Sequence, residues 1–184
     1  LPAPLVILIG LAIGAGIGAI YGAIIAYTKI PPFIATLGAQ LICRAGAKMY
    51  TSRPVSNLTP EFRFLGSAKI GPVPVIILVF FVMFAISAFL LTQTRFGKNV
   101  YAIGGNATSA NLMGISTRSA TIRIYMLSTG LATLAGIVFS IYTQAGYALA
   151  GVGVELDAIA SVVIGGTLLS GGVGTVLGTL FGVA

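Results

Sequence analysis

Hydrophobic and polar residues alternate along this chain in long blocks rather than at single positions. Four mostly apolar runs, at residues 5–28, 33–50, 73–92 and 121–142, are separated by polar segments rich in Pro, Gly or basic residues. Each run is close to the roughly 20 residues that a helix needs to cross the hydrocarbon core of a bilayer. The pattern predicts an all-α fold, a polytopic bundle of transmembrane helices.

The first apolar run carries a regular series of glycines. They recur at every fourth position, as Gly10, Gly14, Gly18 and Gly22, and this spacing places them on one face of a helix. A face of glycines lets the backbone of a second helix approach closely. We therefore expect this face to pack against another helix, although a Gly-rich composition alone also produces such spacing.

The second run is interrupted by a polar stripe in which Thr36, Gln40, Arg44 and Lys48 step by four. A cation inside a span costs about 2.5–3.5 kcal/mol on insertion scales unless it reaches the headgroups or faces a polar interior. Lys48 is near the end of the run and is expected to reach the headgroups. For Arg44 two interpretations stay open: an interfacial anchor, or a residue that lines a wet pathway between helices, together with Gln40.

The segment from residue 155 breaks its own helical pattern. Residues 156–164 make only about half a span, and two glycine pairs follow. Backbone freed at membrane depth must be buried in protein or face water, and broken helices line the route in transporters. We predict a discontinuous Gly-rich membrane segment; the alternative is a plain hairpin of two closely packed helices. The predicted pathway-lining residues are Gln40, Arg44, Gly165, Gly166, Thr167, Ser170, Gly171 and Gly172.

The polar segment between the third and fourth runs, residues 93–118, predicts a short uncharged helix. Asn106 can act as its N-cap, and Gly114 can take the left-handed conformation that follows a helix C-terminus. Such a helix would lie on the membrane surface and expose small side chains with Leu112 and Met113. It is either a simple connector or a ridge that inserts into a groove on a soluble partner. The other long connection, residues 51–72, predicts a turn-rich loop without a helix.

Composition supports the membrane assignment and narrows the function. Hydrophobic residues make up 57% and charged residues 7% of the chain, with a mean hydropathy of +1.07, whereas soluble domains carry about 25% charged residues. The 10 Lys and Arg residues mostly flank the apolar runs, which indicates membrane anchors rather than a nucleic-acid site. The chain has no His and one Cys, Cys43, so we predict no catalytic group, metal or cofactor.

The two acids near the broken segment do not change this prediction. Glu155 and Asp157 are two positions apart, so on a helix they point in different directions. We expect them at the N-terminus of the half-helix, where the macrodipole favours negative charge. A phosphate-binding loop of the GxxxxGK[ST] type is also missing, so any nucleotide is expected to bind another subunit.

Three stretches resemble a known family. They are TRFGKNVYAIGGNATSANLMGI at residues 94–115, ELDAIASVVIGGTLLSGGVGT at residues 155–175, and KIPPFIATLG at residues 29–38, followed by Arg44 and Arg53-Pro54. Taken together, and in their order along the chain, they closely resemble the permease subunits of bacterial ABC importers for monosaccharides, the ribose, xylose, arabinose and galactose group. From about Tyr101 onward the chain especially resembles a galactofuranose permease subunit.

The resemblance implies a role for the short helix and an orientation. The helix would be the cytoplasmic coupling helix that docks into an ATPase subunit. Residues 51–72 and 143–154 would then face the periplasm and Lys29 the cytoplasm, an assignment that the nearly equal Lys and Arg counts of the two long loops leave open. The coupling residues would be Asn106, Ala107, Thr108, Ser109, Ala110, Asn111, Leu112, Met113 and Gly114.

The same resemblance implies a fragment. The family's segment similar to GGIDLSVG, normally upstream, and its last helices are missing. Residues 1–184 are therefore expected to form a single transmembrane permease domain, the central part of a longer chain.

We thus expect a multi-pass permease of the bacterial inner membrane that moves a monosaccharide and has no enzymatic activity itself. Expected partners are a cytoplasmic ABC ATPase, a second permease subunit, a periplasmic sugar-binding protein and the lipid bilayer, but no nucleic acid. The alternatives are a branched-chain amino-acid ABC permease, a secondary sugar carrier or facilitator, and a nontransporting scaffold. A secondary carrier predicts ionisable residues at mid-membrane, and apart from Arg44 the spans supply few.

Overall fold

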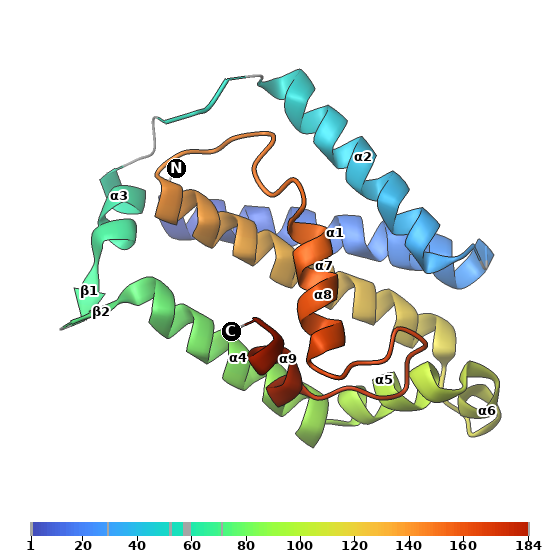
Figure 1. Cartoon of the computed structure of the whole chain (residues 1–184). Helices are drawn as coiled ribbons and strands as arrows, with labels where there is room; N and C mark the ends of the chain where they lie inside the picture. Colours follow the sequence, from blue (N-terminus) through green and yellow to red (C-terminus); the bar gives the residue numbers. More distant parts are fainter. Residues whose placement is uncertain (1, 29, 52, 57–59, 71, 184) are drawn as a thin grey trace. The chain divides into compact units, whose positions relative to one another are not determined.

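A computed structural model describes residues 2–28, 30–51, 53–56, 60–70 and 72–183 (Figure 1). The fold in this part of the chain is helical, which confirms the all-α prediction. The helices are α1 (Ala3–Thr28), α2 (Pro32–Tyr50), α3 (Pro60–Ser67), α4 (Val75–Gln93), α5 (Arg95–Gly105), α6 (Ala107–Leu112), α7 (Thr117–Thr143), α8 (Val154–Ile164) and α9 (Val176–Val183). Two strands of two residues each, β1 (Lys69–Ile70) and β2 (Val73–Pro74), form an antiparallel hairpin.

Three of the described helices, α1, α4 and α7, are long and apolar enough to cross a membrane. The second predicted span, residues 33–50, is also a helix, α2, but it is not among them. Its polar stripe explains the difference, because Gln40, Arg44 and Lys48 lower the hydropathy of a helix of otherwise sufficient length.

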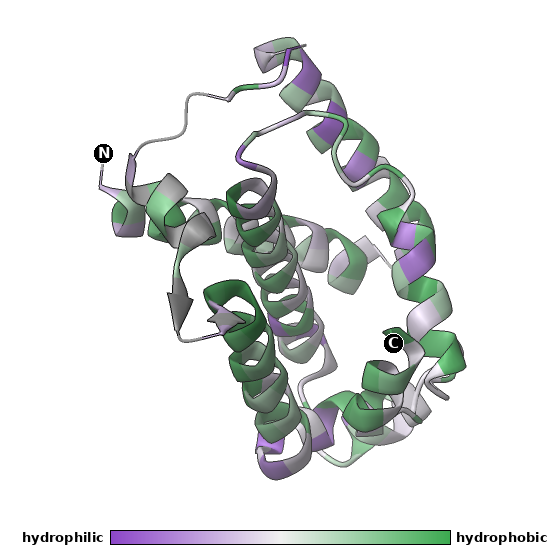
Figure 2. Ribbon diagram, turned by 60° about the vertical axis from the view of Figure 1, so that its left-hand side comes forward, coloured by the Kyte–Doolittle hydropathy of each residue, from purple (hydrophilic) through white to green (hydrophobic). Residues whose placement is uncertain are grey.

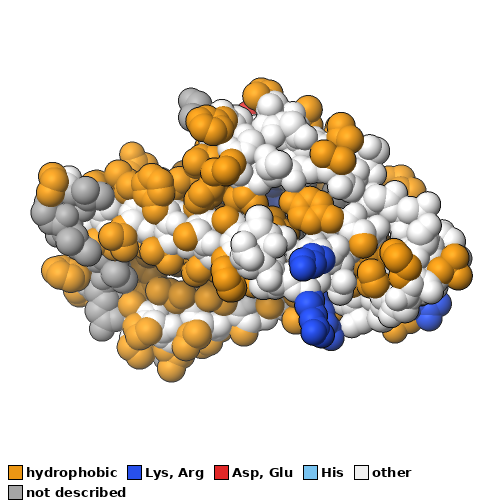
Figure 3. Space-filling model, turned by 90° about the horizontal axis from the view of Figure 1, so that it is seen from below, with side chains coloured by type: hydrophobic (Ala, Val, Ile, Leu, Met, Phe, Trp, Pro, Cys, Tyr) orange, Lys and Arg blue, Asp and Glu red, His pale blue; other side chains and the backbone are white. Residues whose placement is uncertain are grey.

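Hydrophobic residues predominate along the long helices (Figure 2) and many large apolar side chains are exposed. On the face drawn in Figure 3 the hydrophobic side chains are spread over the surface, and only a few Lys and Arg side chains are visible. Soluble proteins rarely expose apolar surface on this scale. The pattern fits a chain whose long helices face lipid or other membrane-embedded subunits.

The contacts within the chain group into two compact units, Leu1–Val79 with Thr121–Ala150, and Phe80–Ala120 with Gly151–Ala184. They are called unit 1 and unit 2 below and are described separately. The single domain expected from the sequence stays a prediction.

In unit 1 the glycine face of α1 lies directly against α7. A Cβ atom added at Gly10 would lie 3.3 Å from Ile137, and one added at Gly22 would lie 3.0 Å from the Cα of Ile122. The contact therefore runs along both helices in opposite directions. Between these ends Gly14 and Gly18 meet the side chains of Thr133 and Thr129. Both threonine hydroxyls donate to carbonyls of their own helix, so no polar group is left unpaired at this close approach.

A small hydrophobic cluster and a contact between two loops hold α1, α3 and the end of α7 together in unit 1. Phe62 of α3 packs with Ala3 of α1 and Ile141 of α7. Val55 and Gly146 exchange backbone hydrogen bonds of 2.8 and 2.9 Å, so the segments before α3 and after α7 meet. The prediction of a helix-free loop at residues 51–72 is wrong, because this segment contains α3. Pro60 occupies its first position, where the missing N–H costs nothing.

In unit 2, α5 follows α4 after a single residue, and the chain reverses direction later, after α8. The α4 helix ends before Thr94, whose hydroxyl accepts a hydrogen bond of 3.3 Å from the Gly97 N–H and so caps α5. Later, α8 and α9 pack against each other, and residues 165–175, called the tip loop below, connect them. The path after Gly172, which the sequence leaves undetermined, is therefore a return of the chain along α8.

Candidate coupling and pathway site

The short helix predicted between the third and fourth runs is present as α6. Asn106 caps it as predicted, because its side-chain oxygen accepts a hydrogen bond of 2.9 Å from the Ser109 N–H. Gly114 has a φ of +83°, the left-handed conformation expected after the helix. The carbonyl of Ser116 then accepts from the Ala120 N–H at 3.0 Å, and α7 begins at Thr117.

The surface of α6 differs in one respect from the sequence expectation. Leu112 and Met113 are 84% and 70% exposed, so they form an apolar tip, as expected. Ala110, by contrast, is fully buried, since α6 packs against α5. The expectation that the small side chains are exposed is therefore wrong for Ala110. The remaining predicted coupling residues, Ala107, Thr108, Ser109, Asn111 and Gly114, are exposed.

The polar stripe of α2 lies on the less exposed side of its helix. Thr36, Gln40 and Arg44 are half-buried, whereas Lys48 at the helix end is exposed. The apolar residues Phe33, Ile34, Leu41 and Ile42 are exposed. This is the reverse of a soluble amphipathic helix, and it is the arrangement expected of a membrane helix with lipid on one side and protein or water on the other.

The broken segment of unit 2 is a hairpin of two short helices whose backbones touch. A Cβ atom added at Gly165 would lie 2.5 Å from the carbonyl oxygen of Gly178. One added at Gly182 would clash with the carbonyl oxygen of Ser161. This close contact is the geometry that the hairpin alternative expects. The helical pattern nevertheless stops at Gly165, as the discontinuous segment requires, and the lining of a pathway by this segment stays a prediction.

The tip loop is shaped by glycines in the left-handed conformation. Gly166, Gly171 and Gly172 have φ values of +83°, +89° and +80°. The loop closes on itself through hydrogen bonds from the Leu168 N–H to the Val173 carbonyl, at 3.0 Å, and from the Gly171 N–H to the Leu168 carbonyl, at 2.9 Å. Among the predicted lining residues, Ser170 is exposed and Thr167 is half-buried.

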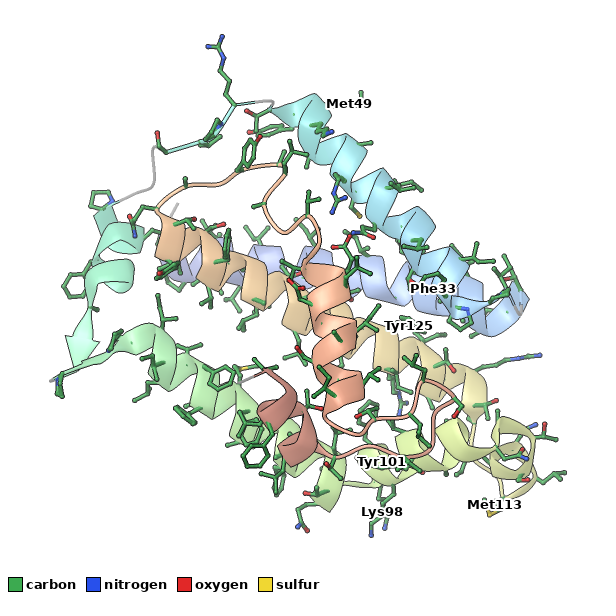
Figure 4. All side chains as sticks on the ribbon, in the orientation of Figure 1. Phe33, Met49, Lys98, Tyr101, Met113 and Tyr125 are labelled. Carbon is green, nitrogen blue, oxygen red and sulfur yellow. The ribbon has the colours of Figure 1, made fainter. Side chains whose placement is uncertain are left out.

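The sequence interpretation missed α5 and its contacts. Tyr101 of α5 donates a hydrogen bond of 2.8 Å to the carbonyl of Gly174 in the tip loop (Figure 4). Gly104 of the same helix touches the tip loop directly, since an added Cβ would lie 2.6 Å from the nitrogen of Gly172. A signal for α5 was available: Thr94 is a good N-cap residue, and Phe96, Val100 and Ile103 follow with helical spacing.

The acids of the broken segment lie where they were expected. Glu155 and Asp157 are both in the first turn of α8. Glu155 accepts a hydrogen bond of 3.2 Å from the Gly153 N–H, and so it satisfies a backbone donor at the helix start. Among the described residues no three His, Cys, Asp or Glu side chains gather in a way that could hold a metal ion.

Comparison of the sequence with known proteins assigns the chain to a family. The family described as branched-chain amino acid transport system / permease component matches residues 1–184. The inner membrane ABC transporter permease protein YjfF of Escherichia coli K12 is 62% identical over 98% of this chain and 55% of its own length. The ribose import permease protein RbsC of Haemophilus influenzae is 38% identical over 99% of this chain and 58% of its own length.

A third relative, the galactose/methyl galactoside import permease protein MglC of Escherichia coli K12, is 38% identical over 100% of this chain and 57% of its own length. The chain thus spans somewhat more than half the length of these relatives. No solved structure matches it. Because the family match covers the whole chain, this protein belongs to the permease-component family of the branched-chain amino acid transport type.

Proposed function

We propose that this chain is part of the permease subunit of an ATP-driven ABC importer that carries a monosaccharide across the bacterial inner membrane. The observation that carries the proposal is the similarity over nearly the whole chain to the ribose and galactose import permeases. The family description mentions branched-chain amino acids, but these individual relatives are named for sugars. The sugar assignment is therefore preferred over the amino-acid one.

The α6 helix is our choice for the site where the ATPase docks. It carries an exposed apolar tip, Leu112 and Met113, and it is capped at both ends, so it presents a stable ridge. It joins the spanning helix α7 through a short turn. Apolar anchors of this kind fit the helix-in-groove mode of protein recognition. A secondary carrier or a scaffold gives no reason for such a ridge.

Two sets of residues are separate candidates for lining the sugar pathway, the α2 stripe in unit 1 and the tip loop in unit 2. Half-burial of Gln40 and Arg44, with apolar residues of α2 exposed, favours the pathway role of Arg44 over a headgroup anchor. The tip loop offers backbone amides and the hydroxyls of Thr167 and Ser170. The described part of the chain would form this pathway together with a second permease subunit and the remainder of the protein.

In the proposed cycle, ATP binding closes two ATPase subunits and displaces the coupling helices. The displacement switches the pathway between outward and inward access. ATP must bind the closed ATPase arrangement more tightly than the open one, because a ligand shifts an equilibrium only by its differential affinity for the two states. A periplasmic binding protein would deliver the sugar, and the chain itself would catalyse no reaction.

Met113 tests the docking role, with Met49 as a matched control. Both residues are methionines with most of their surface exposed, at 70% and 89%, and Figure 4 labels both. Met113→Glu in the complete permease puts a charge into the apolar contact, so it should weaken ATPase co-purification about tenfold or more. Met49→Glu should leave it unchanged. Wild-type ATPase binding by the Met113 variant would reject α6 as the docking helix.

A further inference from the structure

The α5 helix and the tip loop touch through their backbones, without side chains between them. A Cβ added at Gly104 would lie 2.6 Å from the Gly172 nitrogen, and one added at Gly171 would lie 2.7 Å from the Gly104 carbonyl oxygen. Both distances are shorter than real Cβ contacts. Side chains can absorb a displacement by changing rotamer, but two backbones in contact cannot. A shift of α5 toward the tip loop must therefore move the loop.

A hydrogen bond provides a second attachment between α5 and the tip loop. Tyr101 lies about one helical turn before Gly104 in α5. Its hydroxyl donates to the Gly174 carbonyl at 2.8 Å. Tyr101 is half-buried, so this bond is partly shielded from water. The tip loop is thus held at two points on the same side of α5, one polar and one a direct backbone contact.

No flexible linker separates α5 from α6. Asn106 is at once the residue that ends α5 and the residue that begins α6. Its N–H donates to the Ala102 carbonyl at 3.1 Å, and its own carbonyl accepts from the Ala110 N–H at 2.9 Å. The burial of Ala110 adds a packing contact. A rotation between the two helices would have to break these bonds, so we expect α5 and α6 to move together.

The tip loop is joined as firmly to its own helices. The Thr167 N–H donates to the Val162 carbonyl of α8 at 3.1 Å. At the other end the Thr175 hydroxyl accepts from the Gly178 N–H of α9 at 3.0 Å. Because α8 and α9 also touch through Gly165 and Gly178, a force on the loop moves the hairpin as a unit.

We propose that Tyr101 and Gly104 form the mechanical link that carries the displacement of α6 to the α8–α9 hairpin. The inference rests on the proposed function, because it assumes that α6 receives the motion of an ATPase. Tyr101 and Gly104 are positioning residues: they act through the tip loop and need no contact with sugar or nucleotide. Loss of the link should leave ATPase docking intact but reduce the sugar transported per ATP hydrolysed.

The test uses the complete importer, with its ATPase and binding protein, in proteoliposomes. Tyr101→Phe removes the hydroxyl and keeps the ring, and it should lower the sugar transported per ATP about fivefold, the equivalent of one hydrogen bond. Gly104→Ala inserts a Cβ into the backbone contact and should lower the same ratio about tenfold. Co-purification of the ATPase should stay at the wild-type level in both variants.

Two control variants separate the link from general effects. Gly105→Ala makes the same change at the next residue of α5, where an added Cβ meets nothing within 4 Å. Tyr142→Phe removes a hydroxyl from an exposed tyrosine of α7. Both should keep the wild-type ratio. If Gly104→Ala fails to fold, Tyr101→Phe alone decides.

The outcomes distinguish the link from the proposed function. A wild-type complex without ATP-dependent uptake of any tested pentose or hexose rejects the proposed function, and the link with it. A wild-type complex that transports sugar, with an unchanged ratio in Tyr101→Phe and Gly104→Ala, rejects the link alone. Loss of ATPase co-purification in both variants also rejects it, because these residues would then serve assembly.

Discussion

At the scale of single residues, the small size of glycine decides which backbones meet. Gly18 shows this in unit 1, where an added Cβ would lie 2.5 Å from the Tyr125 carbonyl oxygen and 2.9 Å from the Met126 Cα. Gly16, two positions earlier on the same helix, has nothing within 4 Å of an added Cβ. The two glycines have the same helical conformation and differ only in what faces them.

Gly18→Ala should therefore destabilise the permease by about 1–3 kcal/mol, because the new methyl group meets backbone atoms that cannot rotate away. Gly16→Ala should leave stability unchanged or raise it slightly, since Ala favours a helix by about 1 kcal/mol over Gly. The thermal unfolding midpoint of the detergent-solubilised protein measures both effects. Equal midpoints for the two variants would contradict the packing of α1 on α7.

At the scale of elements, α2 shows how a helix can be amphipathic in the sense opposite to that of soluble proteins. Its polar residues Gln40 and Arg44 are half-buried, and its neighbour Leu41 is 65% exposed. In water this arrangement would be unfavourable, because exposed apolar surface costs about 25 cal/mol per Å². In a bilayer the exposed side contacts lipid, and the polar side must find protein or water.

Thiol chemistry distinguishes the two sides of α2. In a Cys43→Ser background, Gln40→Cys in the assembled importer should react with a charged methanethiosulfonate reagent, since a thiol ionises only where water reaches it. Leu41→Cys should stay unreactive, because lipid covers it. The native Cys43 is replaced so that each variant carries a single thiol. Reaction at Leu41→Cys with none at Gln40→Cys would mean that α2 is turned the other way.

At the scale of the whole molecule, α7 links the segment that contains α6 to the segment around Gly146. The helix begins at Thr117, after a four-residue turn that follows α6, and it ends at Thr143, shortly before Gly146, which pairs with Val55. A helix of 27 residues is about 40 Å long, enough to cross a bilayer. The pairing also requires the segments around Val55 and Gly146 to lie on one side, in agreement with the two periplasmic loops that the resemblance implies.

This orientation predicts opposite labelling of two exposed positions. In spheroplasts that carry the complete permease with Cys43→Ser, a membrane-impermeant maleimide should label Tyr147→Cys, after α7, from outside. It should label Asn111→Cys, in α6, only after the membrane is permeabilised. Labelling of Asn111→Cys in intact spheroplasts would place α6 outside the reach of any cytoplasmic ATPase and would overturn the importer proposal.

Much of the element structure follows from the sequence alone, because it depends on local interactions. The long helices follow from runs of apolar residues, and the bounds of α6 follow from Asn106 and Gly114, whose preferences act within one turn. The half-helix α8 likewise ends where Gly165 and Gly166 interrupt the pattern. The α5 helix is the local feature that was missed, and α3 was hidden in a segment that appeared turn-rich because of its prolines.

Only the tertiary structure decided which residues these elements bring together. The sequence shows that Gly14 and Gly18 share a face, but not that Thr133 and Thr129 of α7 fill it. It shows a small Ala110 in α6, but not that this residue is buried. The bond from Tyr101 to Gly174 joins positions far apart in the chain. Spacing and capping act over a few residues, whereas burial and backbone contact depend on where the whole chain returns.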